Sequence, residues 1–182
     1  MQPLRTEPTA QLLPGEICAQ LAEPLQRAHC TDVEFRGAFR VEHGRGWLAR
    51  LLARLSRLPS AGANIETHLL ITADGPHTHW RRSFAGRTFC TTQWFDGSSC
   101  VVERWGPIQL RFRLIVREDE LRYEQAGAAL HVGPLRMPLP RWLAPRVEAS
   151  EWPLECKRVG VRVSVTLPLV GRLLAYEGEV QT

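Results

Sequence analysis

The sequence lacks the short motifs that usually mark nucleotide binding or a serine nucleophile. No GxGxxG follows a candidate strand, and neither a GxxxxGK[ST] phosphate loop nor a GxSxG turn occurs in the 182 residues. The nearest approach, Gly44-Arg45-Gly46, has no third glycine. We therefore expect no NAD binding of the usual kind, no cofactor and no serine hydrolase chemistry.

Long apolar runs and paired cysteines are also missing. No stretch approaches the roughly 18 apolar residues of a membrane span, and Met1-Gln-Pro-Leu-Arg-Thr-Glu lacks the apolar core of a signal peptide. We expect no membrane span and a cytoplasmic location. The five cysteines are odd in number and show no CxxC spacing, which argues against a disulfide framework and a structural zinc site (Cys18, Cys30, Cys90, Cys100 and Cys156).

Charges of both signs are interspersed, and lysine is almost absent. The 23 Lys and Arg residues stand against 19 Asp and Glu residues, and Lys157 is the one lysine. Acidic residues between the six tryptophans and their neighbouring arginines break any continuous basic stripe. We therefore expect no nucleic-acid partner.

What the sequence does contain is the two-residue periodicity of a half-buried antiparallel sheet. We expect a single β domain over residues 31–182, which begins with a strand from Val33 to Glu42 whose weak position is Gly37. Residues 1–30 are expected to form an irregular segment, up to about residue 15, and a short helix interrupted by Pro24, both packed on the domain.

One segment changes to helical periodicity and predicts an amphipathic helix over about residues 45–58. Its apolar stripe and its basic stripe lie on opposite sides (Trp47, Leu48, Leu51, Leu52, Leu55 and Leu58; Arg50, Arg54 and Arg57). We favour packing of the apolar stripe on the sheet, with the arginines in solvent. A membrane-surface or partner-binding helix is the alternative.

Turn signals divide the next region into a meander of strands. Asp74-Gly75 suits a tight hairpin, and a two-residue loop there sets Leu69 opposite Trp80, so that the apolar rows of both strands coincide. Ala85-Gly86 and Asp96-Gly97 mark the second and third turns.

The second half continues in the same way, with one longer interruption. Residues 110–117 alternate most clearly, and Glu118-Asp119-Glu120 turns the chain back. Gly133 to Pro145 holds four prolines and is expected to form a loop outside the sheet. Two strands, over about 161–167 and 174–178, complete the pattern.

About nine or ten strands result, with no βαβ rhythm. A sheet of this size must curl, close or split. The expected fold is therefore mainly β (α+β), a strongly curved antiparallel sheet or barrel with the 45–58 helix at one end or across its open face. This layout is lipocalin-like or helix-grip-like.

Four fragments, taken together, resemble a bacterial family described as domain of unknown function 4166. They are Trp80-Arg81-Arg82-Ser83-Phe84, Val102-Glu103-Arg104-Trp105-Gly106-Pro107, Met137 to Pro145, and Leu167 to Gly171 with Tyr176-Glu177-Gly178. In that family the domain often follows a saccharopine-dehydrogenase-like domain. The resemblance implies a link to oxidoreductases and a dehydrogenase as a partner, but no particular reaction.

Arg82 is the residue whose position most needs an explanation. It shares a strand face with Trp80, where an unpaired guanidinium is costly to bury. Glu103 is a candidate partner if the loop at Asp96-Gly97 has an odd number of residues, whereas a two-residue loop brings Arg104 inward. A structural ion pair and an anchor for the anionic end of a ligand are both open.

A rolled sheet lined by aromatic side chains and a few polar groups commonly encloses an apolar pocket. We therefore expect the protein to bind a small hydrophobic or amphipathic molecule. The candidate ligand-binding residues are Trp80, Arg82, Phe84, Glu103, Trp105, Tyr123 and Tyr176.

Two other functions stay open, although a non-enzymatic role is favoured. An enzyme of isomerase, cyclase or hydrolase type would use Glu103 with Arg82 and a separate oxidoreductase. The sequence does not indicate whether Glu124, Glu151 or Glu177 lies near Glu103. The other is a non-catalytic interaction or dimerisation module, in which the Pro138 to Pro145 loop and the arginine-faced strand at 110–117 contact a dehydrogenase. A homodimer is possible as well.

A metal site is not expected. His77 and His79 place two imidazoles on one strand face, and His68 can lie near them. Two ligands without an anchored third do not make a site.

Overall fold

The computed structural model describes residues 13–30, 32–56, 58–97 and 100–181. The irregular segment predicted before about residue 15 therefore lies almost wholly outside the described residues.

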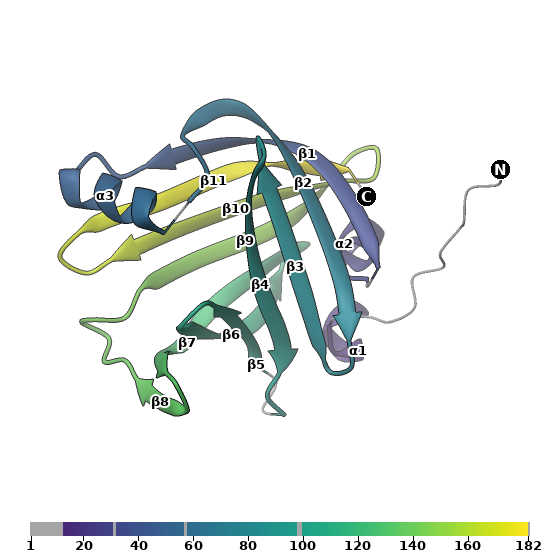
Figure 1. Cartoon of the computed structure of the whole chain (residues 1–182). Helices are drawn as coiled ribbons and strands as arrows, with labels where there is room; N and C mark the ends of the chain where they lie inside the picture. The colour runs from purple at the N-terminus through teal and green to yellow at the C-terminus, as the bar shows by residue number, and fades with distance from the viewer. Residues whose placement is uncertain (1–12, 31, 57, 98–99, 182) are drawn as a thin grey trace.

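Within these residues the chain forms three helices and eleven strands (Figure 1). They are α1 (Gly15–Cys18), α2 (Glu23–Ala28), β1 (Val33–His43), α3 (Trp47–Leu55), β2 (Gly62–Asp74), β3 (His77–Phe84), β4 (Arg87–Phe95), β5 (Cys100–Trp105), β6 (Ile108–Arg117), β7 (Glu120–Val132), β8 (Leu135–Pro138), β9 (Arg146–Leu154), β10 (Arg158–Leu167) and β11 (Gly171–Gln181).

All eleven strands belong to one antiparallel sheet that closes on itself. The strand order is β6-β5-β4-β3-β2-β1-β11-β10-β9-β7-β8, and pairing of β6 with β7 completes a ring of ten strands. β9 pairs with the first part of β7, at Leu121 to Tyr123. β8 lies outside the ring and pairs with the last part of β7, at Ala129 to Val132. The predicted antiparallel barrel of about nine or ten strands is confirmed.

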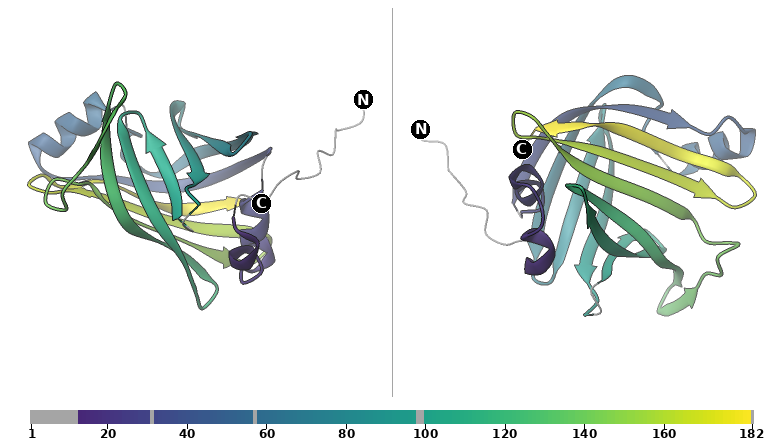
Figure 2. Two further views of the ribbon diagram at one scale, coloured as in Figure 1. Left: turned by 90° about the horizontal axis from the view of Figure 1, so that it is seen from below. Right: turned by 180° about the vertical axis from the view of Figure 1, so that it is seen from behind.

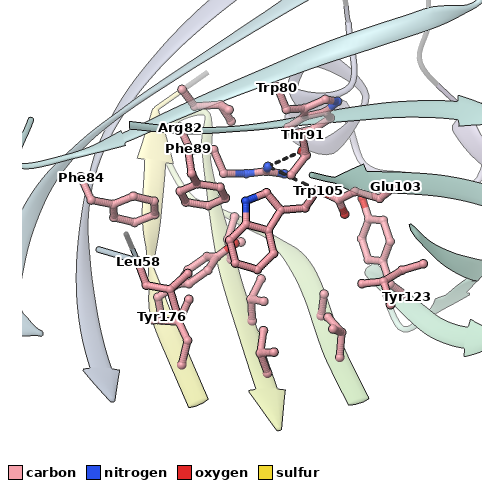
Figure 3. A pocket seen from close by; sticks show the side chains of 18 of the residues that line it. Leu58, Trp80, Arg82, Phe84, Phe89, Thr91, Glu103, Trp105, Tyr123 and Tyr176 are labelled. Atoms are coloured by element: carbon pink, nitrogen blue, oxygen red, sulfur yellow. Dashed lines mark hydrogen bonds and ion pairs between the residues drawn. The ribbon is translucent and has the colours of Figure 1, made fainter. Parts of the chain in front are cut away.

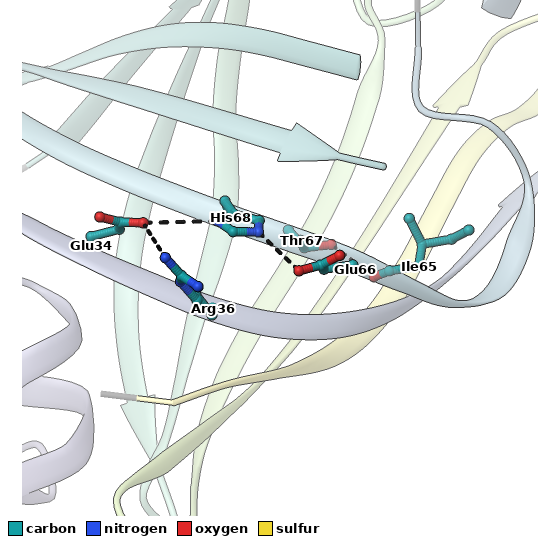
Figure 4. Close-up of polar contacts among 6 residues, drawn as sticks. All are labelled: Glu34, Arg36, Ile65, Glu66, Thr67 and His68. Atoms are coloured by element: carbon teal, nitrogen blue, oxygen red, sulfur yellow. Dashed lines mark hydrogen bonds and ion pairs between the residues drawn. The ribbon is translucent and has the colours of Figure 1, made fainter. Parts of the chain in front are cut away.

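Side chains alternate across the barrel wall as the periodicity predicts. On β1 and β2, Glu34, Arg36, Glu66 and His68 form a polar row on the outer face, with His68 3.1 Å from Glu66 and 3.8 Å from Glu34 (Figure 4). Thr67, between two of them in the sequence, is buried. The outer face is thus wet, and the inner face supplies the core and the interior.

The first hairpin differs from the prediction by two residues. Asp74 pairs with His77, so the loop is Gly75-Pro76 and Trp80 lies opposite Ile71 instead of Leu69. The predicted loop would have left Pro76 in the ladder, where proline has no N–H to donate. Because the shift is even, every side chain keeps its predicted face.

The loop at Asp96 decides which residue of β5 faces inward. Phe95 pairs with Val101, so an odd number of residues, 96–100, separates the two partners. Glu103 consequently faces the interior opposite Gln93, and Arg104 faces out. The alternative with Arg104 inside is wrong. The turn predicted at Ala85-Gly86 is present, with Phe84 opposite Arg87.

Two strands were not predicted. Gly133, with φ of 58°, and Pro134 form a tight turn, and β8 lies within the segment expected to be a loop. Its proline, Pro138, stands at the strand end, where a missing N–H costs little. β9 was overlooked because Glu151 and Pro153 occupy positions of its inward row.

Gly37 is not a weak position of β1, which continues through it. A Cβ atom there would lie 1.9 Å from the carbonyl oxygen of Glu179 on β11. Glycine allows the two backbones to approach closely, so the residue strengthens this pairing.

The helices occupy opposite ends of the barrel (Figures 1 and 2). The predicted N-terminal helix is broken into α1 and α2, with Pro24 in the first turn of α2. Leu21 and Leu25 of this segment are buried in the core at one end. α3 lies at the other end, against β11 and β1.

The packing expected for the apolar stripe of α3 is correct only in part. Leu58 is buried and Leu52 is partly buried against the core, but the rest of the stripe is exposed. Ala49 and Ala53 are the buried residues of the helix, and Trp47, Leu51 and Leu55 are exposed. Small alanine side chains let the helix lie closer to β11 than leucines would permit, and Trp47, Leu51 and Leu55 are left on the outer side of the helix.

Gln125 joins β7 to β9 where their backbones diverge. Its Nε2 donates to the carbonyl of Pro145 and its Oε1 accepts from the N–H of Val147, both at 2.8 Å. We expect Gln125→Ala to lower the free energy of unfolding by about 1–3 kcal/mol, because two backbone groups lose their partner. Urea denaturation measures this loss. Gln20→Ala, which removes an exposed side-chain bond to Glu16, is the control and should change stability little; equal losses would contradict the bridging role.

Candidate functional site

The barrel encloses a cavity of about 330 Å³ (Figure 3). Its walls come from the inward faces of the strands and from α3. All seven candidate ligand-binding residues line it, namely Trp80, Arg82, Phe84, Glu103, Trp105, Tyr123 and Tyr176.

One long wall of the cavity is apolar. Val161, Val163, Val165 and Leu167 follow one another along the inner face of β10 and are only half-buried, although they point into the barrel. Leu52 of α3, with Ser56 and Leu58 beyond the end of the helix, extends this lining. Inward side chains that stay half-exposed face empty space, so the hollow lies toward the α3 end.

Arg82 stands on the opposite wall, between two aromatic rings. Its Cζ lies 5.0 Å from the centre of the Trp80 ring and 5.5 Å from that of Phe89. Its Nη1 donates to Thr91 Oγ1 at 2.8 Å and lies 3.5 Å from Glu103 Oε1. The Nε and Nη2 groups have no acceptor among the described residues, so donors are available for a bound molecule.

Arg82 and Glu103 form a loose pair and not a sealed one. Their side chains are 15% and 21% exposed, respectively. At 3.5 Å the contact is longer than an optimal charge-assisted hydrogen bond. The pair lowers the cost of placing a guanidinium inside the barrel and leaves it accessible from the cavity.

Glu151 links the barrel to the segment that follows α2. Its Oε2 lies 2.8 Å from His29 Nε2, and its Oε1 accepts from the hydroxyl of Tyr123 at 3.1 Å. Burial raises the pKa of Glu151, but the neighbouring His29 and the hydrogen bonds from His29 and Tyr123 outweigh it, so its pKa lies below the ordinary value.

The two tyrosines of the site are neutral hydrogen-bond donors at physiological pH. Burial, and then the charge of Glu151, raises the pKa of Tyr123 well above its usual value. Burial raises the pKa of Tyr176 to about 12. The polar end of the cavity therefore combines one cation, two carboxylates and phenolic hydroxyls.

The structure decides among the carboxylates left open by the sequence. Glu151 lines the cavity with Glu103. Glu124 is exposed, and Glu177 forms an ion pair of 2.9 Å with Arg162 on the outer face.

Several residues of the site were missed by sequence reasoning. Thr91 and Phe89 share a strand face with Gln93, a signal that could have placed them beside Arg82. His29 had no such signal, because nothing in the sequence relates the segment after α2 to β9.

The paired histidines lie on the outer wall. The His77 ring is 5.4 Å from that of Trp94, and His79 Nδ1 lies 3.2 Å from Thr92 Oγ1 and its Nε2 3.8 Å from Asp74. In the described part of the chain, no three His, Cys, Asp or Glu residues group in a way that could hold a metal ion. All five cysteines are free thiols. No described helix has the length and apolar character needed to cross a membrane.

A second hollow, of about 880 Å³, lies between β7 and β9. It is rich in arginine, but Arg122 and Arg162 are already paired with Glu120 and Glu177. Its floor shares Tyr123, Val147 and Ala149 with the inner cavity. The barrel wall is therefore thin at this seam.

Comparison with known proteins gives a family but no activity. A family model described as "Domain of unknown function (DUF4166)" matches residues 21–180, which confirms the resemblance seen in the sequence. No curated protein matches the chain.

Two solved structures are similar in fold. One is a protein of unknown function from the DUF3598 family of Nostoc punctiforme, with 16% identity, a TM-score of 0.49 and coverage of 94% of this chain and 50% of that chain. This chain thus spans about half the length of that protein. The other is a secretary abundant heat soluble protein from Ramazzottius varieornatus, with 11% identity, a TM-score of 0.38 and coverage of 82% and 92%.

Proposed function

Since the chain belongs to the family described as domain of unknown function 4166, whose description names no activity, we propose a function from its interior. The protein binds a small amphipathic molecule inside the barrel. The polar end of the molecule lies at Arg82, and its apolar part lies along Val161, Val163 and Val165. The observation that carries this proposal is the cavity of about 330 Å³, which has apolar walls and one polar end.

The size and charge of the cavity limit the ligand. Pockets for small molecules begin at about 300 Å³, so a compact molecule fits better than a long-chain lipid. Arg82 offers free donors, while Glu103 and Glu151 offset its charge. A polar end with an oxygen acceptor, a carbonyl or a single carboxylate, matches this arrangement.

Arg82→Leu is the first test. We expect it to weaken binding of the amphipathic dye 1-anilinonaphthalene-8-sulfonate about ten- to hundredfold, because a charge-assisted hydrogen bond of roughly 1.5–3 kcal/mol is lost. The melting temperature should change little, since Glu103 keeps contact with solvent through the cavity. Fluorescence titration and thermal unfolding measure the two effects.

Arg104→Leu is the matched control, because this arginine lies on the outer face of the strand that carries Glu103. It should leave dye binding unchanged. A destabilised Arg82→Leu variant with unaltered dye affinity would show that Arg82 serves a structural ion pair. Native mass spectrometry of the purified protein identifies any molecule already bound.

The closeness of Glu103, Glu151 and Tyr123 favours one second function, acid–base catalysis on the bound molecule. A general acid or base works best with a pKa near the operating pH. The pKa of Glu151 is lowered and that of Tyr123 is raised, so both move away from neutrality. Glu103 is the candidate for this role because it lines the cavity beside Arg82 and is accessible from it. Conversion of the recovered molecule that stops in Glu103→Gln, with dye binding intact, distinguishes an enzyme from a binding protein.

The free thiols support a reducing, cytoplasmic setting for this function. Cys90 and Cys156 are exposed and unpaired. Exposed thiols persist where glutathione keeps them reduced. A dehydrogenase partner rests on the family resemblance alone and is tested by co-purification.

A further inference from the structure

α3 presents three different sides at the end of the barrel. Ala49 and Ala53 pack toward β11 and β1. Leu52 and Ser56 line the cavity. The helix therefore forms the boundary between the apolar end of the cavity and the outside.

The remaining side of α3 is apolar and exposed. Trp47, Leu51 and Leu55 are 72%, 44% and 71% exposed, and Leu48 lies beside them at 36%. At about 100° per residue these four side chains fall within one arc of about 100°. Large apolar side chains gathered in one exposed patch mark an interaction surface, unlike single exposed ones.

Arginines flank this apolar arc without acidic neighbours in the sequence. The segment 44–58 contains four arginines and no Asp or Glu. Arg50 and Arg54 are exposed, and neither has a carboxylate partner within the described part of the chain. They fall next to Trp47 on the helical projection, where they can reach a surface that the arc contacts.

Two further segments reach the same end of the barrel (Figures 1 and 2). The turn between β10 and β11 carries Leu169, which is 97% exposed. The loop between β8 and β9 carries exposed Trp142 and Leu143 next to Arg141. We refer to the outer side of α3, this turn and this loop as the rim. Each of the three carries exposed apolar residues, and α3 and the loop also carry exposed arginines.

We propose that this rim docks on the surface of an anionic phospholipid bilayer. Trp and Leu side chains enter the region between headgroups and acyl chains, and the arginines attract anionic lipids. Ion pairs with carboxylates would show that these arginines stabilise the fold. Arg50 and Arg54 have no such pairs among the described residues, so their charges are available to a binding surface. Docking of this kind places the apolar end of the cavity one helix away from the lipid. It does not depend on the ligand proposed above.

Flotation with lipid vesicles tests the proposal. We expect the protein to bind vesicles of phosphatidylcholine mixed with phosphatidylserine at least tenfold more tightly than vesicles of phosphatidylcholine alone. Binding to the mixed vesicles should weaken as the salt concentration rises, because salt screens the attraction between arginine and phosphatidylserine. The triple variant Trp47→Ser, Leu51→Ser, Leu55→Ser should weaken binding to the mixed vesicles at least tenfold. Arg50→Glu with Arg54→Glu should remove the preference for phosphatidylserine.

Matched controls lie on the barrel wall. Leu70→Ser, at an exposed leucine of β2, and Arg81→Glu with Arg104→Glu should leave vesicle binding unchanged. Dye binding by the triple variant should persist, so that failure of docking and failure of ligand binding are separate results.

Either of two results would overturn the proposal. One is vesicle binding that the triple variant retains in full. The other is a protein that does not bind vesicles and sediments as a dimer, while the triple variant sediments as a monomer. That result would assign the rim to contact with a second copy of the chain.

Discussion

Glu151→Leu is expected to lower the free energy of unfolding by about 3–5 kcal/mol, the loss typical of removing a buried carboxylate from its hydrogen-bond partners. The carboxylate accepts from Tyr123 and lies 2.8 Å from His29, and its side chain is only 14% exposed. Leucine leaves both partners without an acceptor in the core, and each orphaned group costs about 1–3 kcal/mol. Urea denaturation at neutral pH measures the loss.

Glu151→Gln provides the control of equal size. Its amide oxygen can still accept one hydrogen bond, so we expect it to lose less than Glu151→Leu. Tyr123→Phe combined with Glu151→Leu should cost less than the sum of the two single changes, because they remove the same hydrogen bond. Full additivity would contradict the coupling of Tyr123 with Glu151.

The pH dependence of the free energy of unfolding should also show the contribution of the Glu151 carboxylate. The pKa of Glu151 is lower in the folded protein than its ordinary value of 4.5. The carboxylate therefore stabilises the fold above that ordinary pKa, and this contribution is lost as pH falls through the folded value. The stability of Glu151→Gln should approach that of the unchanged protein in this acidic range. A difference that grows toward acid would mean that the folded pKa is raised.

Most of what the sequence could predict came from the alternation of apolar and polar residues, which assigns each residue to one of the two faces of the sheet. It placed Arg82, Trp80 and Phe84 on one inward face, and this placement survived a hairpin register that was wrong by two residues. Parity is unaffected by an even shift, because side chains repeat every second residue. The face of Glu103 depended on a loop with an odd number of residues, which local sequence did not determine.

Contacts between segments far apart in the chain could not be predicted from the sequence. His29 and Glu151 lie 122 residues apart, and alternation says which face a residue takes but not which strands become neighbours. β9 was overlooked since its inward row holds Glu151, a polar residue that only becomes acceptable beside Tyr123 and His29.

The orientation of α3 was predicted only in part, for a related reason. Its apolar stripe is wide enough to suggest a core contact, yet the helix packs through Ala49 and Ala53. A pattern of polarity shows that a helix has two faces. It does not show that a small-residue face gives a closer approach to a strand, nor that the larger apolar face is left for another surface.

Val163→Trp should abolish dye binding while leaving the protein folded. Val163 projects from β10 into the cavity, opposite Tyr176 on one side and Ala149 on the other. An indole at this point occupies space that the apolar part of a ligand needs. Because it enters a hollow and not a packed core, we expect a change in stability of less than about 1 kcal/mol.

The stability of this variant tests the cavity as directly as its dye binding does. If side chains filled the interior in solution, the added bulk would overpack the core and cost about 1–3 kcal/mol. Ser164→Trp, on the outer face of the same strand, is the control and should bind dye as the unchanged protein does. A destabilised Val163→Trp variant that still binds dye would place the dye outside the barrel and remove the basis for a ligand site beside Arg82. A stable variant without dye binding would support a hollow interior that the ligand enters.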